Sequence, residues 1–314
     1  ARQIVKAVRE GKLSEEAVDS CVDRLLEAIQ TLVKGKEEGE KPKDFDERAH
    51  HELAKKAAAE SAVLLKNQED ILPLKPGTHV ALIGDFAFDP RYQGAGSSMV
   101  NSTRLDKISD MIGEYDLMVT GMTKGYVRTG EPDTVLEKEA VDLARAADVV
   151  LYCFGLDELS ESEGVDRAHM RIPQNQITLL ESITRVNPNA VAILCAGSAI
   201  EMPWINSVKA LLHGYLCGQA GAGALLDIIV GKVNPSGRLS ETYPLRYEDT
   251  PAFKYFPSEQ RNSEYREALY VGYRYYDTAK VRVQFPFGFG LSYTEFEYSD
   301  LQVDEMGADF ILTN

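Results

Sequence analysis

Short, almost continuous apolar runs alternate with amphipathic stretches through the middle of the chain. The apolar runs cover residues 79–84, 115–120, 148–154, 190–195 and 208–215. Such runs have the length of strands, and strands that are apolar throughout are typical of a parallel sheet buried on both faces. Helical stretches are expected near residues 134–147, 174–186 and 219–231. The alternation predicts an α/β fold, with a mainly parallel sheet flanked by helices on both faces.

The chain before the sheet is expected to be helical. Apolar residues recur at helical spacing over residues 18–32, and Ser14 is a plausible N-cap for that helix. Residues 34–44 are charged and contain glycine and proline, which indicates a linker. A second helix is expected over residues 46–66, with the apolar run 63–65 included in it.

The alternation ends after residue 239. Residues 240–300 are rich in Tyr, Phe, Pro and charged residues, which predicts a loop-rich extension with a few short strands. Such a region serves either as packing on the domain or as a contact surface for a neighbouring domain. We therefore expect five segments, with boundaries at residues 1–33, 34–66, 67–239, 240–300 and 301–314.

Composition excludes several classes of partner. The 314 residues are 44% hydrophobic, enough to bury one sizeable core, and the net charge is −15. A strongly acidic chain is poorly suited to nucleic acid or to anionic membranes, and no apolar stretch has the length of a transmembrane helix. We expect neither nucleic acid nor membrane as a partner, whereas a homo-oligomer is left open.

Cysteine and histidine usage gives no sign of a metal site. The cysteines are Cys21, Cys153, Cys195 and Cys217, and they are scattered without metal-ligand spacing. Two of them lie within apolar runs, where a thiol behaves as a small hydrophobe. Reduced structural cysteines favour a reducing compartment, so a cytoplasmic location is expected. The five histidines form no HExxH motif, and we expect no metal and no cofactor.

One acidic loop follows the apolar run at 148–154. Its charged residues are Asp157, Glu158, Glu161, Glu163, Asp166 and Arg167. In open parallel sheets, ligands bind beyond the carboxyl ends of the strands, which is where this loop begins. The position favours acid/base catalysis, whereas the composition also suits a solvated surface loop. The residues alone leave both interpretations open.

A nucleotide-binding function is a second class of hypothesis for a sheet with a glycine-containing loop. Gly94 and Gly96 lie about ten residues beyond the first strand of the alternation, outside a tight strand-to-helix turn. The chain contains neither GxGxxG nor GxxxxGK[ST]. A nucleotide is therefore disfavoured.

Five ordered motifs are shared with a known family. They are SAVLLKN at 61–67, YQGAGSS at 92–98, NPSGRL at 234–239, YVGYRYY at 270–276 and FPFGFGLSYT at 285–294. With them the chain resembles glycoside hydrolase family 3, namely the part of a family 3 β-glucosidase that follows the nucleophile-bearing barrel. The resemblance implies that residues 1–33 are the last helix of an upstream (β/α) barrel and that 34–66 are a linker and connecting helix. It also implies an α/β sandwich over 67–239 and the start of a truncated fibronectin-like domain at 301–314.

The resemblance further implies a retaining hydrolysis of terminal β-linked glucose from oligosaccharides or glycosides. Retaining glycosidases need two carboxyl groups, a nucleophile and an acid/base. The implied nucleophile is an aspartate of the barrel, upstream of residue 1, so this chain alone is expected to be inactive. The implied acid/base is Glu163, with Glu161 as runner-up and Glu158 also near.

Further roles follow from the same resemblance. The residues implied to bind the sugar are Arg91, Gln93, Ser97 and Ser98, whose donors suit sugar hydroxyls. A plain surface loop is the alternative for them. Asp166 and Arg167 are expected to position the acidic loop through an ion pair or backbone hydrogen bonds. The expected partners are a β-glucoside or oligosaccharide, the upstream barrel and the downstream fibronectin-like domain.

Two other functions stay open beside β-glucosidase. One is a noncatalytic module that binds carbohydrate or docks a neighbouring domain. The other is a different family 3 specificity such as β-xylosidase.

Overall fold

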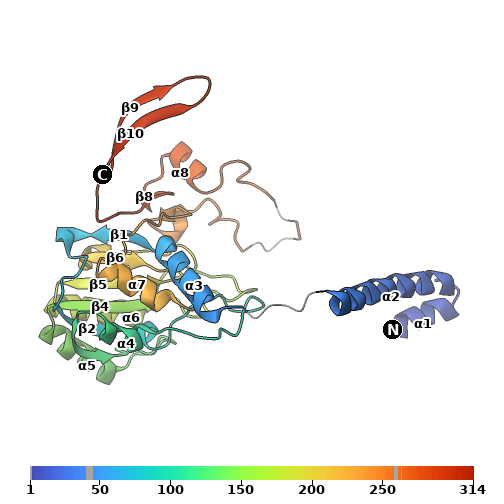
Figure 1. Ribbon diagram of the computed structural model, residues 1–314, viewed down its shortest axis with the longest axis horizontal. Helices are drawn as coiled ribbons and strands as arrows, with labels where there is room; N and C mark the ends of the chain where they lie inside the picture. The colour runs from blue at the N-terminus through green and yellow to red at the C-terminus, as the bar shows by residue number, and fades with distance from the viewer. Residues whose placement is uncertain (1, 40–44, 258–260, 263) are drawn as a thin grey trace. The chain divides into compact units, whose positions relative to one another are not determined.

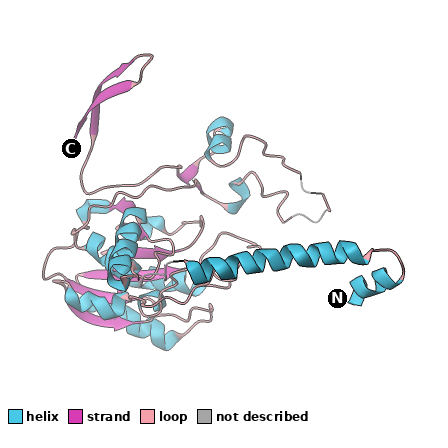
Figure 2. Cartoon of the chain, turned by 45° about the vertical axis from the view of Figure 1, so that its right-hand side comes forward, coloured by secondary structure: helices cyan, strands magenta, loops and turns pink. Residues whose placement is uncertain are grey.

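The computed structural model describes residues 2–39, 45–257, 261–262 and 264–314 (Figure 1). The chain divides into two compact units, Ala1–Asp46 and Glu47–Asn314. The first contains α1 (Arg2–Arg9) and α2 (Glu15–Glu38), and α2 is one continuous helix in Figure 2. Ser14 is the N-cap of α2, as predicted, because its side chain accepts the N–H of Ala17 at 3.2 Å.

Helix α2 extends further than the sequence predicted. α2 continues to Glu38, past residue 34, where the linker was expected to begin. Residues 40–44 of that predicted linker lie outside the described residues. No helix in the described part of the chain is long and apolar enough to cross a membrane.

A six-stranded sheet forms the centre of the second unit. Its strands are β1 (Val63–Asn67), β2 (His79–Ile83), β3 (Met118–Thr123), β4 (Val149–Gly155), β5 (Ala190–Cys195) and β6 (Ala210–His213). They are ordered β1-β6-β5-β4-β2-β3, and all neighbours are parallel except β1 and β6. Every residue of β4 is buried, as expected for a central strand covered on both faces. The predicted mainly parallel α/β fold is confirmed.

Helices cover both faces of this sheet. They are α3 (Glu47–Ser61), α4 (Ile108–Met111), α5 (Thr134–Ala146), α6 (Gln174–Val186) and α7 (Gly221–Ile229). α7 packs against α3 and α4, and α5 packs against α6. The chain moves one way across the sheet from β2 to β3 and the opposite way from β3 through β4 to β6. Because crossovers are right-handed, this reversal places α4 and α5 on opposite faces.

The predicted helix over residues 46–66 is wrong at its end. α3 stops at Ser61, and Val63–Asn67 form β1, which pairs antiparallel with β6. Val63 and Leu64 are fully buried, and a strand beside β6 buries such a run while satisfying its backbone groups. The strand expected at 115–120 also lies slightly later, at Met118–Thr123.

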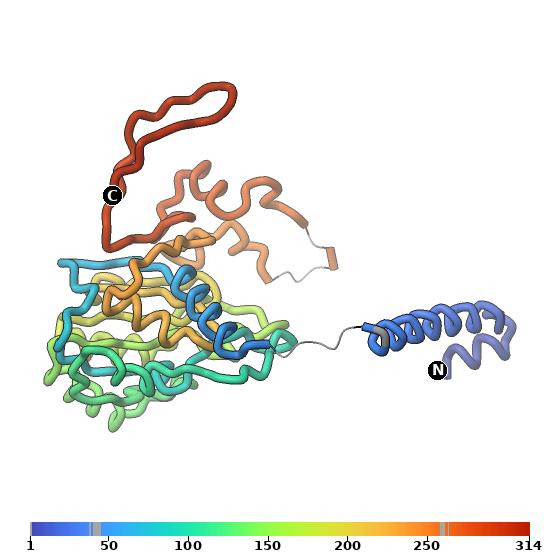
Figure 3. Tube along the Cα trace, in the orientation of Figure 1, coloured from blue at the N-terminus to red at the C-terminus, as the bar shows by residue number. Residues whose placement is uncertain are grey.

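Residues beyond 240 contain few regular elements, and the last of them form a hairpin that stands away from the sheet in Figure 1. They contain β7 (Tyr243–Pro244) paired with β8 (Val283–Phe285), α8 (Tyr273–Ala279), and a separate hairpin of β9 (Glu297–Val303) and β10 (Ala308–Thr313). The Leu291 N–H donates to the Leu64 carbonyl at 2.8 Å, so segments far apart in sequence meet there (Figure 3). Short 3-10 helices occur at Gln68–Asp70, Asp85–Ala87, Ile112–Glu114, Ile205–Ser207 and Tyr247–Asp249.

Candidate active site

The site lies where the order of the strands reverses, between β2 and β4. In open α/β sheets the crevice beyond the carboxyl ends of two such strands is the usual place for a ligand. Three loops meet there, and each follows a strand. The loop after β2 carries Arg91, Gln93, Ser97 and Ser98, the loop after β4 carries Glu158, Glu161, Glu163 and Arg167, and the loop after β5 carries Gly197 and Ser198.

The loops after β2 and β4 are joined directly. Ala95 and Ser162 form an isolated parallel bridge, and the N–H of Glu163 donates to the Ala95 carbonyl at 3.3 Å. Gly96 has φ +104°, and a Cβ at that position would lie 2.8 Å from the Cβ of Glu163. Only glycine adopts this conformation without strain and leaves room for the glutamate. The close approach of the two loops therefore depends on Gly96.

Glu163 is exposed and is bonded through a single oxygen. The backbone N–H of Ser97 donates to Oε2 at 2.9 Å, and the hydroxyl of Ser97 donates to the same oxygen. These two hydrogen bonds hold the pKa of Glu163 below its ordinary value, because they favour the charged form. In the described part of the structure, Oε1 has no hydrogen-bond partner. Glu163 thus has one anchored oxygen and one available oxygen.

Glu161 is bonded through both oxygens, and its side chain is only 9% exposed. Oε2 forms an ion pair with Arg91 and accepts the Gly197 N–H at 2.8 Å. Oε1 accepts the Ser198 hydroxyl at 2.5 Å and lies 3.6 Å from the Arg167 guanidinium. Burial raises the pKa of Glu161, but the bonds from Ser198, Gly197 and Arg91 outweigh burial and lower it. Glu161 is therefore held as a carboxylate.

Glu158 is engaged by an arginine from a different loop. Arg128, which follows β3, lies 3.1 Å from Oε1 of Glu158 and donates through Nε to Asp85 at 2.6 Å. The guanidinium also lies 4.3 Å from the centre of the Phe86 ring. Burial acts to lower the pKa of Arg128, but Asp85 and Glu158 together raise it. Sequence reasoning missed Arg128, because nothing near it in sequence marks its partners.

The other predicted site residues differ in what their side chains do. The side chain of Arg91 is 2% exposed and also donates to the Leu156 carbonyl at 3.2 Å, so it holds the two loops together. The amide of Gln93 donates to the Val100 carbonyl at 3.0 Å and accepts the Val100 N–H at 2.9 Å. These hydrogen bonds to the protein's own backbone favour a positioning role over sugar binding for Arg91 and Gln93. Substrate binding stays a prediction for Arg91, Gln93, Ser97 and Ser98.

Arg167 connects the acidic loop to the loop after β5. Its Nη1 donates to the Ser198 hydroxyl at 2.8 Å and to the Ala199 carbonyl at 3.5 Å. Asp166 is exposed and forms no ion pair within the described residues. Gly197 and Ser198 were also missed, although they lie just after Ala196 at the end of the apolar run 190–195 and so at the same edge of the sheet.

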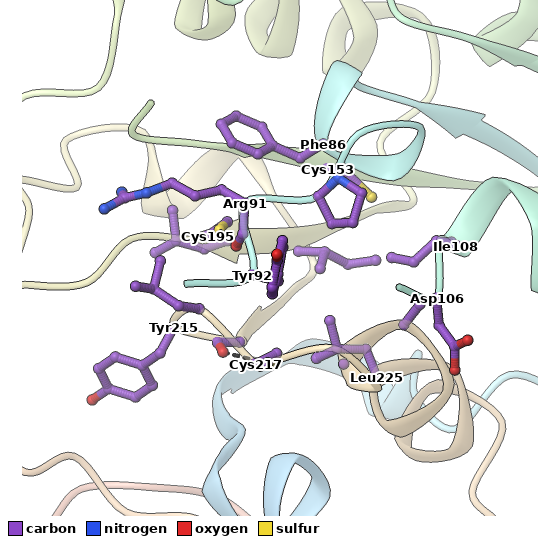
Figure 4. A pocket seen from close by; sticks show the side chains of 18 residues that line it. Phe86, Arg91, Tyr92, Asp106, Ile108, Cys153, Cys195, Tyr215, Cys217 and Leu225 are labelled. Atoms are coloured by element: carbon purple, nitrogen blue, oxygen red, sulfur yellow. Dashed lines mark hydrogen bonds between the residues drawn. The ribbon is translucent and has the colours of Figure 1, made fainter. Parts of the chain in front are cut away.

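A small apolar cavity lies beneath these loops (Figure 4). Its volume is about 50 Å³, and its lining includes Cys153, Cys195 and Cys217. Burial raises the pKa of the thiols of Cys195 and Cys217 to about 12, so both remain protonated and unreactive. Pockets for small-molecule ligands occupy roughly 300–1,000 Å³. A sugar ring therefore does not fit in this cavity.

Comparison with known proteins gives consistent matches along the chain. Residues 62–293 match the protein family described as the glycosyl hydrolase family 3 C-terminal domain. The "Thermostable beta-glucosidase B" of Acetivibrio thermocellus is 48% identical over 307 residues, which cover 97% of this chain and 40% of that protein. The "Exo-alpha-(1->6)-L-arabinopyranosidase" of Bifidobacterium breve is 40% identical over 99% of this chain and 42% of that protein.

A solved structure agrees with these relatives. The crystal structure of the GH3 beta-glucosidase of Bifidobacterium adolescentis superposes with a TM-score of 0.82 at 40% identity, over 96% of this chain and 44% of that one. The chain thus spans about two fifths of the length of the proteins it matches.

Proposed function

The chain belongs to glycoside hydrolase family 3, and from this premise we propose that it is part of a retaining β-glucosidase whose general acid/base is Glu163. The observation that carries the assignment is the state of the three glutamates in the loop after β4. Glu163 is exposed, keeps one oxygen available and, unlike Glu158 and Glu161, forms no ion pair with an arginine within the described residues. An acid/base must present an oxygen to the glycosidic bond, and this arrangement permits it.

The contacts of the other two glutamates, Glu161 and Glu158, make them less suited to the acid/base role. Both oxygens of Glu161 accept hydrogen bonds, from Arg91, Gly197 and Ser198, and taking up a proton would break its ion pair with Arg91. Glu158 is paired with Arg128, which is shared with Asp85. We assign both residues to positioning the loop, with Arg167 supporting Glu161.

In the proposed mechanism, Glu163 acts twice. It first donates a proton to the glycosidic oxygen as the bond to the anomeric carbon breaks and an aspartate of an upstream barrel attacks that carbon. Its carboxylate then accepts a proton from water, which displaces the aspartate. An effective acid needs a pKa near the working pH, whereas the two bonds from Ser97 keep the pKa of Glu163 low. Desolvation by a barrel and a bound sugar would raise it towards the working pH.

The identity of the sugar depends on contacts outside this chain. We propose terminal β-linked glucose, supported by the name of the relative that is 48% identical. The arabinopyranosidase at 40% identity makes an α-L-arabinopyranoside the comparison substrate, and an aryl β-xyloside tests the xylosidase alternative.

The test compares the full-length parent with its Glu163→Gln variant on aryl β-glucosides with good and poor leaving groups. Loss of the acid is expected to lower kcat/KM on the poor leaving group by about 10²–10⁴-fold and to affect the good one far less. Glu158→Gln is the matched control, because it removes a charge from the same loop without removing the proton donor. Equal losses for the two variants would contradict the assignment, and turnover of the arabinopyranoside or the xyloside alone would correct the substrate.

A further inference from the structure

The turn that contacts Glu163 contains two hydrogen-bond donors that are not used to close the turn itself. The N–H of Met99 donates to the Gly96 carbonyl at 3.3 Å, which closes a four-residue turn with Ser97 at its second position. The N–H at that position takes no part in the bond that closes such a turn. Ser97 therefore directs its N–H and its hydroxyl outward, and both donate to Oε2 of Glu163.

This contact makes the two oxygens of Glu163 unequal. Oε2 accepts two hydrogen bonds, whereas Oε1 has no partner in the described ranges. The charged groups nearest in the packed loops have other partners: Glu161 is paired with Arg91 from the loop after β2 and lies near Arg167 of its own loop, and Glu158 is paired with Arg128. Asp166 of the same loop is exposed and forms no ion pair within the described residues. The loop after β5 contributes the neutral donors Gly197 N–H and Ser198 hydroxyl, and both bond to Glu161. Ser97 is thus the main polar neighbour of the Glu163 carboxylate.

We propose that Ser97 is a positioning residue that anchors Oε2 of the acid/base and reserves Oε1 for the proton that moves in the reaction. The inference rests on the proposed role of Glu163. It differs from the role expected for Ser97 from sequence, which is to bind the sugar.

The chemistry follows from which form of Glu163 the bonds stabilise. In the acid form the proton is on Oε1, and it passes to the glycosidic oxygen as the bond to the anomeric carbon breaks. The negative charge that is left is then stabilised by the two donors of Ser97 on Oε2. In the second step Oε1 takes a proton from water while the water oxygen bonds to the anomeric carbon. Ser97 therefore makes Glu163 a stronger acid, at some cost to its strength as a base.

The test uses Ser97→Ala, Ser97→Thr and Ser98→Ala in the full-length parent. Removing the hydroxyl is expected to move the alkaline limb of the pH profile of kcat/KM upward by about 0.5–1 unit. It is also expected to lower kcat/KM on a poor leaving group by roughly three- to tenfold, with little effect on a good one. Ser97→Thr keeps a hydroxyl and restores the wild-type limb. Ser98→Ala removes a hydroxyl from the same turn but no bond to Glu163, so it leaves the limb in place even if KM changes through lost sugar binding.

A rise in KM for Ser97→Ala that is equal for all substrates, with an unmoved limb, overturns the proposal and returns Ser97 to sugar binding. That result is distinct from failure of the acid/base assignment. If Glu163→Gln retains the alkaline limb and the wild-type dependence on the leaving group, Glu163 is not the acid and the proposed function fails. If Glu163→Gln abolishes the alkaline limb but Ser97→Ala leaves it unchanged, the proposed role of Ser97 is refuted while the role of Glu163 stands.

Discussion

Replacing Glu161 by alanine is expected to destabilise the sheet unit by about 3–5 kcal/mol at pH 7, the cost of removing one partner of a buried ion pair. The side chain of Arg91 is 2% exposed, so its charge would remain in the interior without a partner. The Gly197 N–H and the Ser198 hydroxyl would lose an acceptor as well. Glu161→Gln keeps the shape and one acceptor oxygen, so a smaller loss of about 2–3 kcal/mol is expected.

The effect of Glu161 should depend on pH in a defined direction. Burial raises the pKa of Glu161, but the bonds from Ser198, Gly197 and Arg91 lower it further, so the folded state binds its proton more weakly than the unfolded chain. The stabilisation is fully present above the unfolded glutamate pKa of about 4.3 and is lost as the pH falls through the lower folded value. The difference between wild type and Glu161→Gln should therefore be large at pH 7 and shrink below about pH 4.

Urea unfolding followed by tryptophan fluorescence measures this difference. Trp204 is the single tryptophan of the chain, is 5% exposed and packs against Phe154 at 5.0 Å between ring centres, so its emission reports on the core. Glu163→Gln is the matched control, because an exposed glutamate of the same loop should change stability by no more than about 0.5 kcal/mol. A Glu161→Ala variant as stable as wild type, or a difference that is constant with pH, would refute the reasoning.

Three further predictions concern other positions. Gly96→Ala should reduce the activity of the parent, because the added Cβ would lie 2.8 Å from the Cβ of Glu163. The urea midpoint should be nearly preserved, because the turn is exposed; a large fall in the midpoint would contradict this. Gly84→Ala should yield no soluble monodisperse protein on size-exclusion chromatography, because φ is +126° and a Cβ would lie 1.8 Å from the Cys153 carbonyl oxygen. Burial lowers the pKa of His213 to about 4, so the folded state binds fewer protons than the unfolded chain between about pH 4 and 6.5. Stability should fall by about 2 kcal/mol from pH 7 to pH 5, and urea midpoints at the two pH values should differ less in His213→Gln.

Much of the sheet was predictable because its strands are buried on both faces. A run such as Val149–Gly155, with every residue buried, leaves a continuous apolar signal. Residues 63–65 gave the same signal, yet their assignment to a helix was wrong. A short apolar run suits a buried helix end as well as a strand. Residues 63–65 form a strand because β6, about 150 residues later in the chain, pairs with their backbone hydrogen-bonding groups.

The sequence by itself determined the fold class, the family resemblance and the loop in which the chemistry is proposed to lie, because apolar periodicity and ordered motifs are local properties. The resemblance placed Glu163 ahead of Glu161 and Glu158, but the residues themselves give no physical reason to distinguish three acidic neighbours in one loop. The tertiary structure separated them by bringing Arg128, Arg91 and Ser97 from the loops after β2 and β3. The pKa of a carboxyl group and the availability of its oxygens depend on such partners, and only folding decides which partner each glutamate meets.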